Sequence, residues 1–293
     1  MLNLERLRVL HAIATTGSVR AAADTLHVTT SAISQQITRL EREVGLELTE
    51  KQGRGIRLTT PGIRLAEHAA RLLSHAEAIE ADLSTLHTEV TGELTIAAVA
   101  TAARALVPPA IVRLQEVHPG LRVSVREQEP SQSVPAVHQG HIDMAIIQDW
   151  PDPAHAMPDS VSSRHLLDDP LVIALPGTHP LAGRSSIPIS ELNDIDWVAW
   201  PPDQLCHDWL LRILGPTARI RHTASEHSTQ LSLVAAGLGV ALLPTLGADP
   251  VPANVRLIPL ETPVTRCLRV IWRTPATDRP AIQAVLSTLG NQT

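Results

Sequence analysis

The chain has 293 residues, a formal net charge of −6, 44% hydrophobic residues and 18% charged residues. This composition excludes a disordered chain and a protein that coats nucleic acid along its whole length, but it allows a small DNA-reading module on an acidic body. With two cysteines, no apolar run of about 20 residues and no signal-peptide core, we expect a cytoplasmic protein without a disulfide framework, a four-cysteine zinc site or a membrane span. No cofactor or metal is expected.

Three helices are expected at the amino terminus. Apolar spacing predicts them at about Leu4 to Thr15, Ser18 to Leu26 and Ser31 to Val44. In the first, one face carries Leu4, Leu7, His11 and Ala14. In the third, aliphatic residues form a buried stripe, and the opposite face carries hydroxyl, amide and guanidinium groups. The residues of that face are Ser31, Ser34, Gln35, Thr38 and Arg42, with Arg39 at the edge.

That polar face suits the major groove of DNA, where each base pair presents its own donor and acceptor pattern. Two short helices followed by such a helix form the layout of a helix-turn-helix. For the third helix alone, an ordinary solvated helix face is the slightly better interpretation. The alternating residues that follow it favour DNA, because they predict a two-stranded wing whose glycine-containing turn, Lys51-Gln52-Gly53-Arg54-Gly55, carries cations for phosphate.

Several segments of this front end resemble the winged helix-turn-helix of LysR-type transcriptional regulators. They are Ser18-Val-Arg-Ala-Ala-Ala-Asp-Thr-Leu, Thr30-Ser-Ala-Ile-Ser-Gln-Gln-Ile and Arg54-Gly-Ile-Arg-Leu-Thr-Thr-Pro-Gly62. Two positions depart from the family, which commonly has Phe where this chain has Ile13 and Thr49. The resemblance implies that the third helix reads the major groove, and the candidate DNA-binding residues are Ser18, Thr29, Thr30, Ser31, Ser34, Gln35, Thr38, Arg39, Lys51 and Arg54.

A long helix is expected from Pro61 to Val90. Its apolar residues are spaced alternately by three and four positions and form a candidate dimer seam of Ala69, Leu72, Ala76, Ile79, Leu83, Leu86 and Val90. Packing against the body of the same chain would also cover such a seam. The resemblance implies instead that two linker helices pair antiparallel, giving a homodimer or homotetramer that reads a dyad site in double-stranded DNA.

From residue 91 onward, alternating strand and helix patterns predict an α/β body with parallel strands. Segments such as Asp169-Pro-Leu-Val-Ile-Ala resemble the effector domain of the same family. The expected fold class is therefore α/β, with an N-terminal all-α winged helix-turn-helix, a long linker helix and a two-subdomain effector domain of periplasmic-binding-protein type. The expected domains are residues 1–60, 61–90 and 91–293, with subdomain I at about 91–164 plus 266–293 and subdomain II at about 165–265.

A small-molecule effector is expected in the cleft between these subdomains, where strand ends and helix starts converge, with an anion as one candidate. The candidate effector-binding residues are Thr101, Ser131, Gln148, Trp150, Trp200, Pro201, His227 and Ser228. For each of them alone, a helix cap or loop packing is an equally good interpretation.

Signals for enzymes and metals are weak. His138, His141 and Asp143 have tolerable metal spacing, but turn and cap roles are favoured over ligation. Cys206 fits an inert position on a helix better than a thiol site or a redox pair with Cys267. We therefore expect a ligand-responsive, non-enzymatic DNA-binding regulator, with RNA polymerase as a candidate partner. The alternative is a solute-binding or catalytic α/β domain whose front end is an interaction module.

Overall fold

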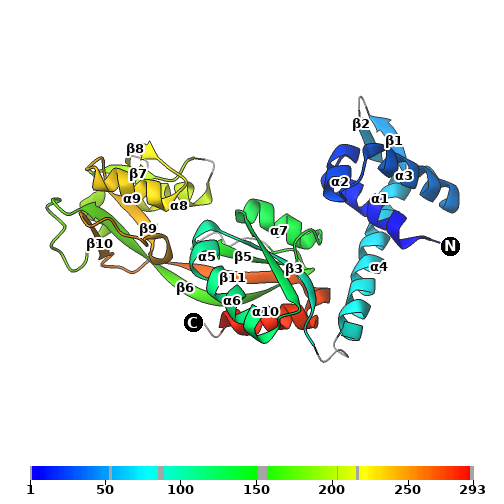
Figure 1. Cartoon of the computed structure of the whole chain (residues 1–293). Coiled ribbons are helices and arrows are strands. Elements are labelled where there is room, and N and C mark those ends of the chain that lie inside the picture. Colours follow the sequence, from blue (N-terminus) through cyan, green and yellow to red (C-terminus); the bar gives the residue numbers. More distant parts are fainter. Residues whose placement is uncertain are drawn as a thin grey trace.

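The computed structural model describes residues 2–52, 55–84, 89–150, 157–202, 204–215 and 218–290. Figure 1 shows an elongated molecule with an amino-terminal domain at one end, the helix α4 beneath it, and a body in which a long β-strand runs through two sheets. The expected α/β fold class is confirmed. No helix in the described ranges has both the length and the apolar character needed to cross a membrane.

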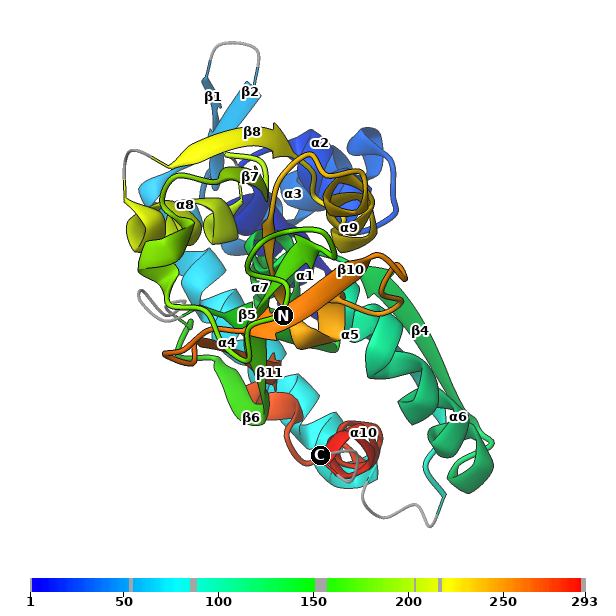
Figure 2. The same cartoon turned by 90° about the vertical axis from the view of Figure 1, so that its left-hand side faces the viewer.

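The amino-terminal domain has three helices and a hairpin. They are α1 (Leu4–Thr16), α2 (Val19–Thr25), α3 (Thr30–Val44), β1 (Thr49–Gln52) and β2 (Gly55–Leu58). The Ser18 and Thr29 hydroxyls cap α2 and α3 by accepting from the backbone N–H groups of Ala21 and Ala32 at 3.1 and 3.2 Å. All four ends of α2 and α3 therefore match the sequence prediction to within a residue, because cap chemistry is local. Figure 2 shows the β1–β2 hairpin projecting beyond the helices.

The predicted face of α1 needs a correction. Leu7 is buried, but Leu4 and Ala14 are exposed, and the buried residues are centred on Leu10 and Ile13. The apolar face is rotated because α2, α3 and α4 all pack against α1 and together cover a wider arc than a single stripe.

The helix α4 (Thr60–Ser84) is shorter than the predicted linker helix. Val90 lies beyond its end and packs against the core of the body, and Ala69 is fully buried in the core of the amino-terminal domain. Both residues therefore make contacts within the chain, so their assignment to the dimer seam is wrong. Leu72, Ile79 and Leu83 are 46%, 49% and 56% exposed, Ala76 is half-buried, and Leu86 lies outside the described residues.

The body begins with a sheet covered on both sides. Its first elements are β3 (Gly92–Ala98), α5 (Ala100–Ala105), α6 (Val107–Val117), β4 (Leu121–Glu127), α7 (Pro130–His138), β5 (Met144–Asp149) and β6 (Val161–Pro176). The strands β4, β3 and β5 are parallel, as expected, but β11 joins β5 antiparallel and β6 in turn pairs antiparallel with β11. Two helices lie between β3 and β4, because Pro108 and Pro109 fit only a first helical turn and so begin a new helix.

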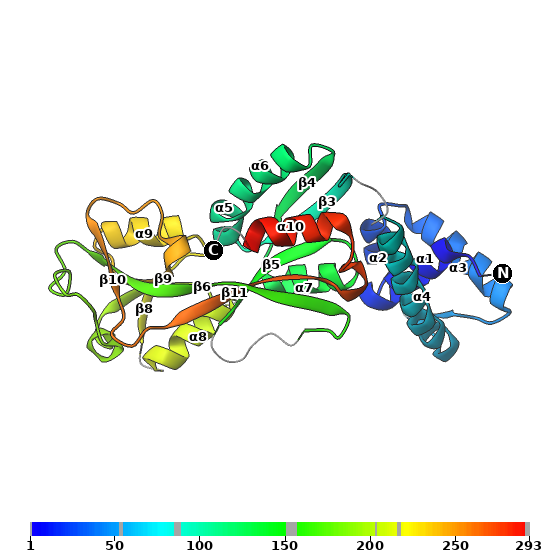
Figure 3. The same ribbon diagram turned by 90° about the horizontal axis from the view of Figure 1, so that it is seen from below.

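Alternate residues of the central strands face different layers. Ile96 and Ile146 pack with α5, α6 and α10, whereas Ala97 and Ala145 pack with α7 on the other face. Figure 3 shows α10 beside α6.

The second part of the body completes both sheets. Its elements are η1 (Ile189–Leu192), β7 (Asp196–Ala199), α8 (Leu205–Leu214), β8 (Arg219–Thr223), α9 (His227–Ala235), β9 (Ala241–Pro244), η2 (Thr245–Gly247), β10 (Val255–Pro259), β11 (Thr265–Arg273), η3 (Thr274–Ala276) and α10 (Pro280–Gly290). The expectation lacked β10. The expected subdomain boundary near residue 165 falls inside β6, a strand of 16 residues that pairs with β11 in its first part and with β9 and β10 in its last part.

Candidate functional site

The first candidate site is the polar face of α3 with the residues that lead into it. Every predicted DNA-binding residue in the described chain is exposed, including Lys51 on β1, whereas Arg54 lies outside the described residues. We call Thr30, Ser31, Ser34, Gln35, Thr38 and Arg39 the recognition surface. It lies on the side of α3 opposite Ile33, Ile37 and Leu40, which are buried.

The members of the recognition surface differ in how they are engaged. The hydroxyls of Ser34 and Thr38 donate to the backbone oxygens one turn earlier, Thr30 O and Ser34 O, at 3.0 Å each. The side chains of Gln35 and Arg39 have no hydrogen bond or ion pair with any described residue. Gln35 therefore offers a free amide and Arg39 a free guanidinium, the two groups that can bind adenine and guanine edges through paired hydrogen bonds.

Glu41 fixes the hairpin against α3. Its Oε1 accepts from the backbone N–H groups of Leu48 and Thr49 at 2.9 and 3.1 Å, and from the Thr49 hydroxyl at 3.1 Å. On the other side, α4 approaches so closely that a Cβ on Gly62 would lie 2.1 Å from the backbone oxygen of Leu48. Glu41 and Gly62 were not assigned these positioning roles from the sequence, although Gly62 ends one of the segments that carry the resemblance.

The turn between α2 and α3 has a specific backbone geometry. His27 adopts a φ of 53°, in the left-handed region, and the Val28 N–H bonds back to Ala23 O at 3.0 Å. This geometry ends α2 abruptly and sets the angle at which α3 leaves the turn.

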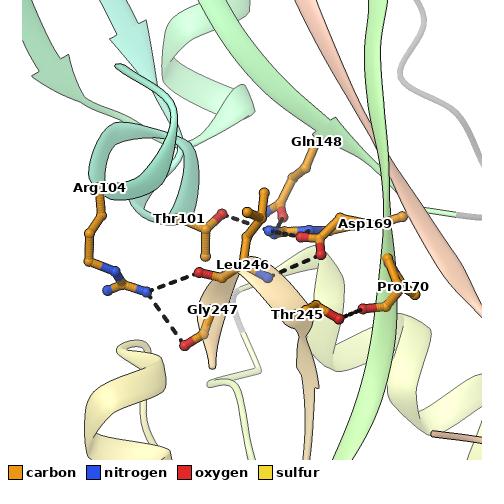
Figure 4. A network of polar contacts seen from close by, with 9 residues as sticks. Thr101, Arg104, Gln148, Asp169, Pro170, Thr245, Leu246 and Gly247 are labelled. Carbon is orange, nitrogen blue, oxygen red and sulfur yellow. Dashed lines mark hydrogen bonds and ion pairs between the residues drawn. The ribbon is translucent and has the colours of Figure 1, made fainter. Parts of the chain in front are cut away.

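The second candidate site lies where the two sheets of the body meet. Arg266, 2% exposed on β11, donates from Nε and Nη2 to Asp169 Oδ2 on β6 at 3.0 and 2.7 Å. Its Nη1 donates to Gln148 Oε1 on β5 at 2.5 Å, and Nη2 also donates to Thr101 Oγ1 on α5 at 2.7 Å. We call these four residues the junction network; Figure 4 shows it between the two sheets.

The junction network reaches η2 through backbone contacts. Asp169 Oδ1 accepts from the Leu246 N–H at 3.1 Å, and Arg104 Nη2 donates to the oxygens of Leu246 and Gly247 at 3.5 and 3.4 Å (Figure 4). The carboxylate of Asp169 thus compensates the buried charge of Arg266 and also holds the second part of the body. At the exposed rim, Gln148 Nε2 donates to Glu129 Oε2 at 3.3 Å, and partial desolvation raises the pKa of Glu129.

Next to the network lies an aromatic cluster. The ring centroids of Trp150 and Trp200 are 5.6 Å apart, Trp150 lies 4.7 Å from Trp209, and Trp200 lies 5.9 Å from the His227 ring. The indole N–H of Trp150 and Nε2 of His227 are buried and have no partner in the described structure. Burial, followed by the charges of Arg266 and Arg104, lowers the pKa of His227 to about 3, so this imidazole is neutral.

The predicted effector-binding residues are thus only partly brought together. Thr101 and Gln148 meet at Arg266, and Trp150, Trp200 and His227 meet in the aromatic cluster. Ser131 and Ser228 are exposed, and Pro201 is half-buried. None of these three has a side-chain contact among the described residues that connects it to the junction network or to the aromatic cluster. The Thr101 hydroxyl oxygen, expected to hold an anion, already accepts from Arg266.

A cavity of about 1030 Å³ lies elsewhere, between the amino-terminal domain and the body. Its lining is rich in basic groups, including His11, His141 and Arg273. Burial and then neighbouring positive charges lower the pKa of both histidines. None of the predicted effector-binding residues lines this cavity.

The residues considered for metal binding or thiol chemistry have structural contacts. Asp143 accepts from the Thr95 N–H at 2.8 Å and from Arg279 at 2.6 Å, and His138 Nδ1 lies 2.7 Å from Ser160 Oγ. Cys206 is a buried free thiol, and burial raises its pKa to about 12. Structural roles for Asp143 and Cys206, as preferred from the sequence, agree with these contacts.

Arg266 and Asp169 were not assigned functional roles from the sequence. No local signal singles them out, because β6 also carries Arg164, His165 and Asp168, and β11 also carries Arg269 and Arg273. The pairing itself could not be read, since the two residues are 97 positions apart.

Two family models match the chain. Residues 4–63 match "Bacterial regulatory helix-turn-helix protein, lysR family", and residues 87–293 match "LysR substrate binding domain". The curated protein LrrA of Synechococcus elongatus, a probable HTH-type transcriptional regulator, is 29% identical over 293 residues, covering 98% of this chain and 96% of its own length.

Solved structures share the fold of the whole chain. A full-length OxyR variant from Pseudomonas aeruginosa is 23% identical with a TM-score of 0.73, and the match covers 99% of this chain and 98% of that one. Full-length CbnR, solved in complex with its target DNA, is 20% identical with a TM-score of 0.57, and the match covers 100% of both chains.

Proposed function

The chain belongs to the LysR family of bacterial helix-turn-helix regulators, and we propose that its recognition surface reads base edges in the major groove while the junction of its two sheets binds a small-molecule effector. It is a DNA-binding transcriptional regulator and not an enzyme, in line with relatives that are named as transcriptional regulators. The observation that carries the DNA-reading proposal is the pair Gln35 and Arg39, which are exposed on one helix face and have no partner among the described residues.

A binding experiment tests this proposal. Full-length protein is titrated into a labelled fragment from upstream of its own gene, and the Gln35→Ala and Arg39→Ala variants are compared with wild type at fixed salt. A lost base-edge pair costs about 1–3 kcal/mol, so we expect each variant to bind roughly tenfold more weakly, with an unchanged unfolding temperature.

Arg113→Ala is the matched control, because Arg113 is an exposed arginine on α6 in the body. It should bind like wild type. Equal affinities for Arg39→Ala, Gln35→Ala and wild type would show that this helix face does not read DNA.

The effector part of the proposal is supported by the junction network. Its buried guanidinium, carried by β11, is held by groups from three other elements, β5, β6 and α5, so a ligand that changed those contacts would change the relative position of the two sheets. An anionic effector, such as a carboxylate, would compete with Asp169 for Arg266.

A thermal-shift screen of carboxylate-containing metabolites tests the effector site. We expect a stabilising compound whose effect is lost in Thr101→Val, since Thr101 contacts Arg266. The effect should be retained in Thr95→Val, whose hydroxyl pairs with Ser124 between β3 and β4. A compound whose effect both variants retain would place its site elsewhere.

A further inference from the structure

A group of three potential metal ligands lies where β6 passes beside β11. The donor atoms of His165, Asp168 and Cys267, one nitrogen, one oxygen and one sulfur, all lie within 4.8 Å of one another. His165 Nε2 and Asp168 Oδ1 are 2.8 Å apart. No other group of at least three such side chains is as close in the part of the chain that the structure describes.

A β-bulge creates this grouping. Residues three apart in a regular strand point to opposite faces, so His165 and Asp168 would ordinarily be separated. Here Asp168 pairs with Cys267, Leu167 with Leu268, and His165 with Arg269, which leaves Leu166 as the extra residue. The extra residue turns His165 to the face of Asp168 and Cys267, an effect that bulges have on side-chain direction.

This face is separate from the junction network. Arg266 and Asp169, the direct neighbours of Cys267 and Asp168, point into the buried junction. The alternation of a strand therefore directs Cys267 and Asp168 to the other face, where the side chains of His165 and Asp168 are 57% and 67% exposed. A metal ion in solvent can reach all three donors without opening the junction.

The electrostatic environment at the sulfur favours a cation. Asp168 on β6 and Asp149 on β5 both pair with Cys267 in the strand register, so two carboxylates flank the sulfur on this face. A negative potential that disfavours a thiolate also attracts a metal ion. Arg269 opposes this potential, but its guanidinium contacts Asp149 and Ser163.

We propose that His165, Asp168 and Cys267 bind a divalent transition-metal ion of the Zn²⁺ type across β6 and β11. Mixed nitrogen, oxygen and sulfur donors suit such an ion, whereas Mg²⁺ and Ca²⁺ prefer oxygen alone. Bonds of about 2.0–2.3 Å place tetrahedral donors roughly 3.3–3.7 Å apart, a spacing that side-chain rotation can reach at this exposed site. On binding, the thiol releases its proton to solvent, and water fills the fourth position.

Cobalt titration tests the site, because Co²⁺ occupies zinc sites and its thiolate complexes have a charge-transfer absorption. Tag-free full-length protein is treated with a chelator, titrated with Co²⁺ and then with competing Zn²⁺. We expect a thiolate-to-cobalt band that saturates at about one equivalent and is lost on adding Zn²⁺. Cys267→Ser should abolish the band, and His165→Gln should weaken Co²⁺ binding roughly tenfold or more.

Cys206→Ser is the matched control, because Cys206 is the second free thiol and lies on α8, buried in the core. It should retain the band. Absence of the band in wild type, or its loss in Cys206→Ser, would overturn the proposal. If Cys267→Ser fails to fold, His165→Gln and Asp168→Asn decide instead, because both of these side chains are exposed. An unweakened cobalt band in both variants would overturn the proposal. None of these readouts involves DNA or effector binding.

Discussion

The recognition surface and the junction network use polar groups in opposite ways. On α3, Gln35 and Arg39 are exposed and unpaired within the described chain, and on α4 the apolar side chains of Leu72, Ile79 and Leu83 are exposed too. In the body, Arg266 is buried and its donors are used within the chain. The difference teaches that the front end is built to be completed by other molecules, whereas the junction contributes to the stability of the chain itself.

The largest expected effect comes from breaking the junction network. Asp169→Asn leaves the Arg266 charge buried without a counter-ion and should lower the free energy of unfolding by about 3–5 kcal/mol. Asp196→Asn is the matched control, because Asp196 pairs with Arg219 and Arg221 at the surface and should cost about 1 kcal/mol or less. Urea unfolding of both variants measures this. Equal losses would mean that burial does not distinguish the two ion pairs.

A second prediction concerns the exposed apolar residues of α4. If the exposed apolar face of α4 forms the interface between two copies of the chain, Leu83→Asp should reduce the sedimenting mass toward that of one protomer. The interface would lose about 1.5–3 kcal/mol of apolar burial per chain and gain an unpaired charge. Helix content by circular dichroism should not change. Leu238→Asp, at an exposed apolar position after α9, is the control and should assemble like wild type. A wild-type mass for Leu83→Asp would exclude this face from the interface.

The smallest effect is a pH dependence at the edge of the junction. The pKa of His227 is about 3 in the folded chain and 6.5 without burial. Below pH 6.5 the unfolded chain binds a proton that the folded chain does not bind, so the free energy of unfolding falls by about 1 kcal/mol between pH 6.5 and 5.5. We expect His227→Gln to flatten this slope between pH 6.5 and 5.5, measured by thermal unfolding. His75→Gln, an exposed histidine on α4, is the control for loss of an imidazole. A slope unchanged in His227→Gln would show that His227 does not carry it.

The two regions also differ in how well the sequence predicted them. The recognition surface lies on one helix, where a period of 3.6 residues decides which side chains are exposed, so local pattern was sufficient. The residues of the junction network are up to 165 positions apart in the chain, and only folding brings Thr101 to Arg266. Prediction from strand ends selected Thr101 and Gln148, which both contact Arg266 in the structure, but it could not identify Arg266 as the residue that joins them.

The linker helix shows a third outcome. Its spacing of three and four residues runs through Ala69 and Val90, but both are covered by the chain's own cores. Periodicity states that a face is apolar and does not state what covers it. The same limit explains why the bulge at Leu166 was not predicted, because no local pattern distinguishes an extra residue in a strand from a regular one.

The continuity of β6 through both sheets determines how the body can move. A strand of 16 residues that is hydrogen-bonded to β11 in one sheet and to β9 and β10 in the other is not a flexible hinge loop. Paired strands resist bending within their own plane but twist easily about their long axis. The two halves of the body can therefore reorient by twisting β6 about its long axis. A rotation of one sheet then changes the angle between the two sheets and does not separate them.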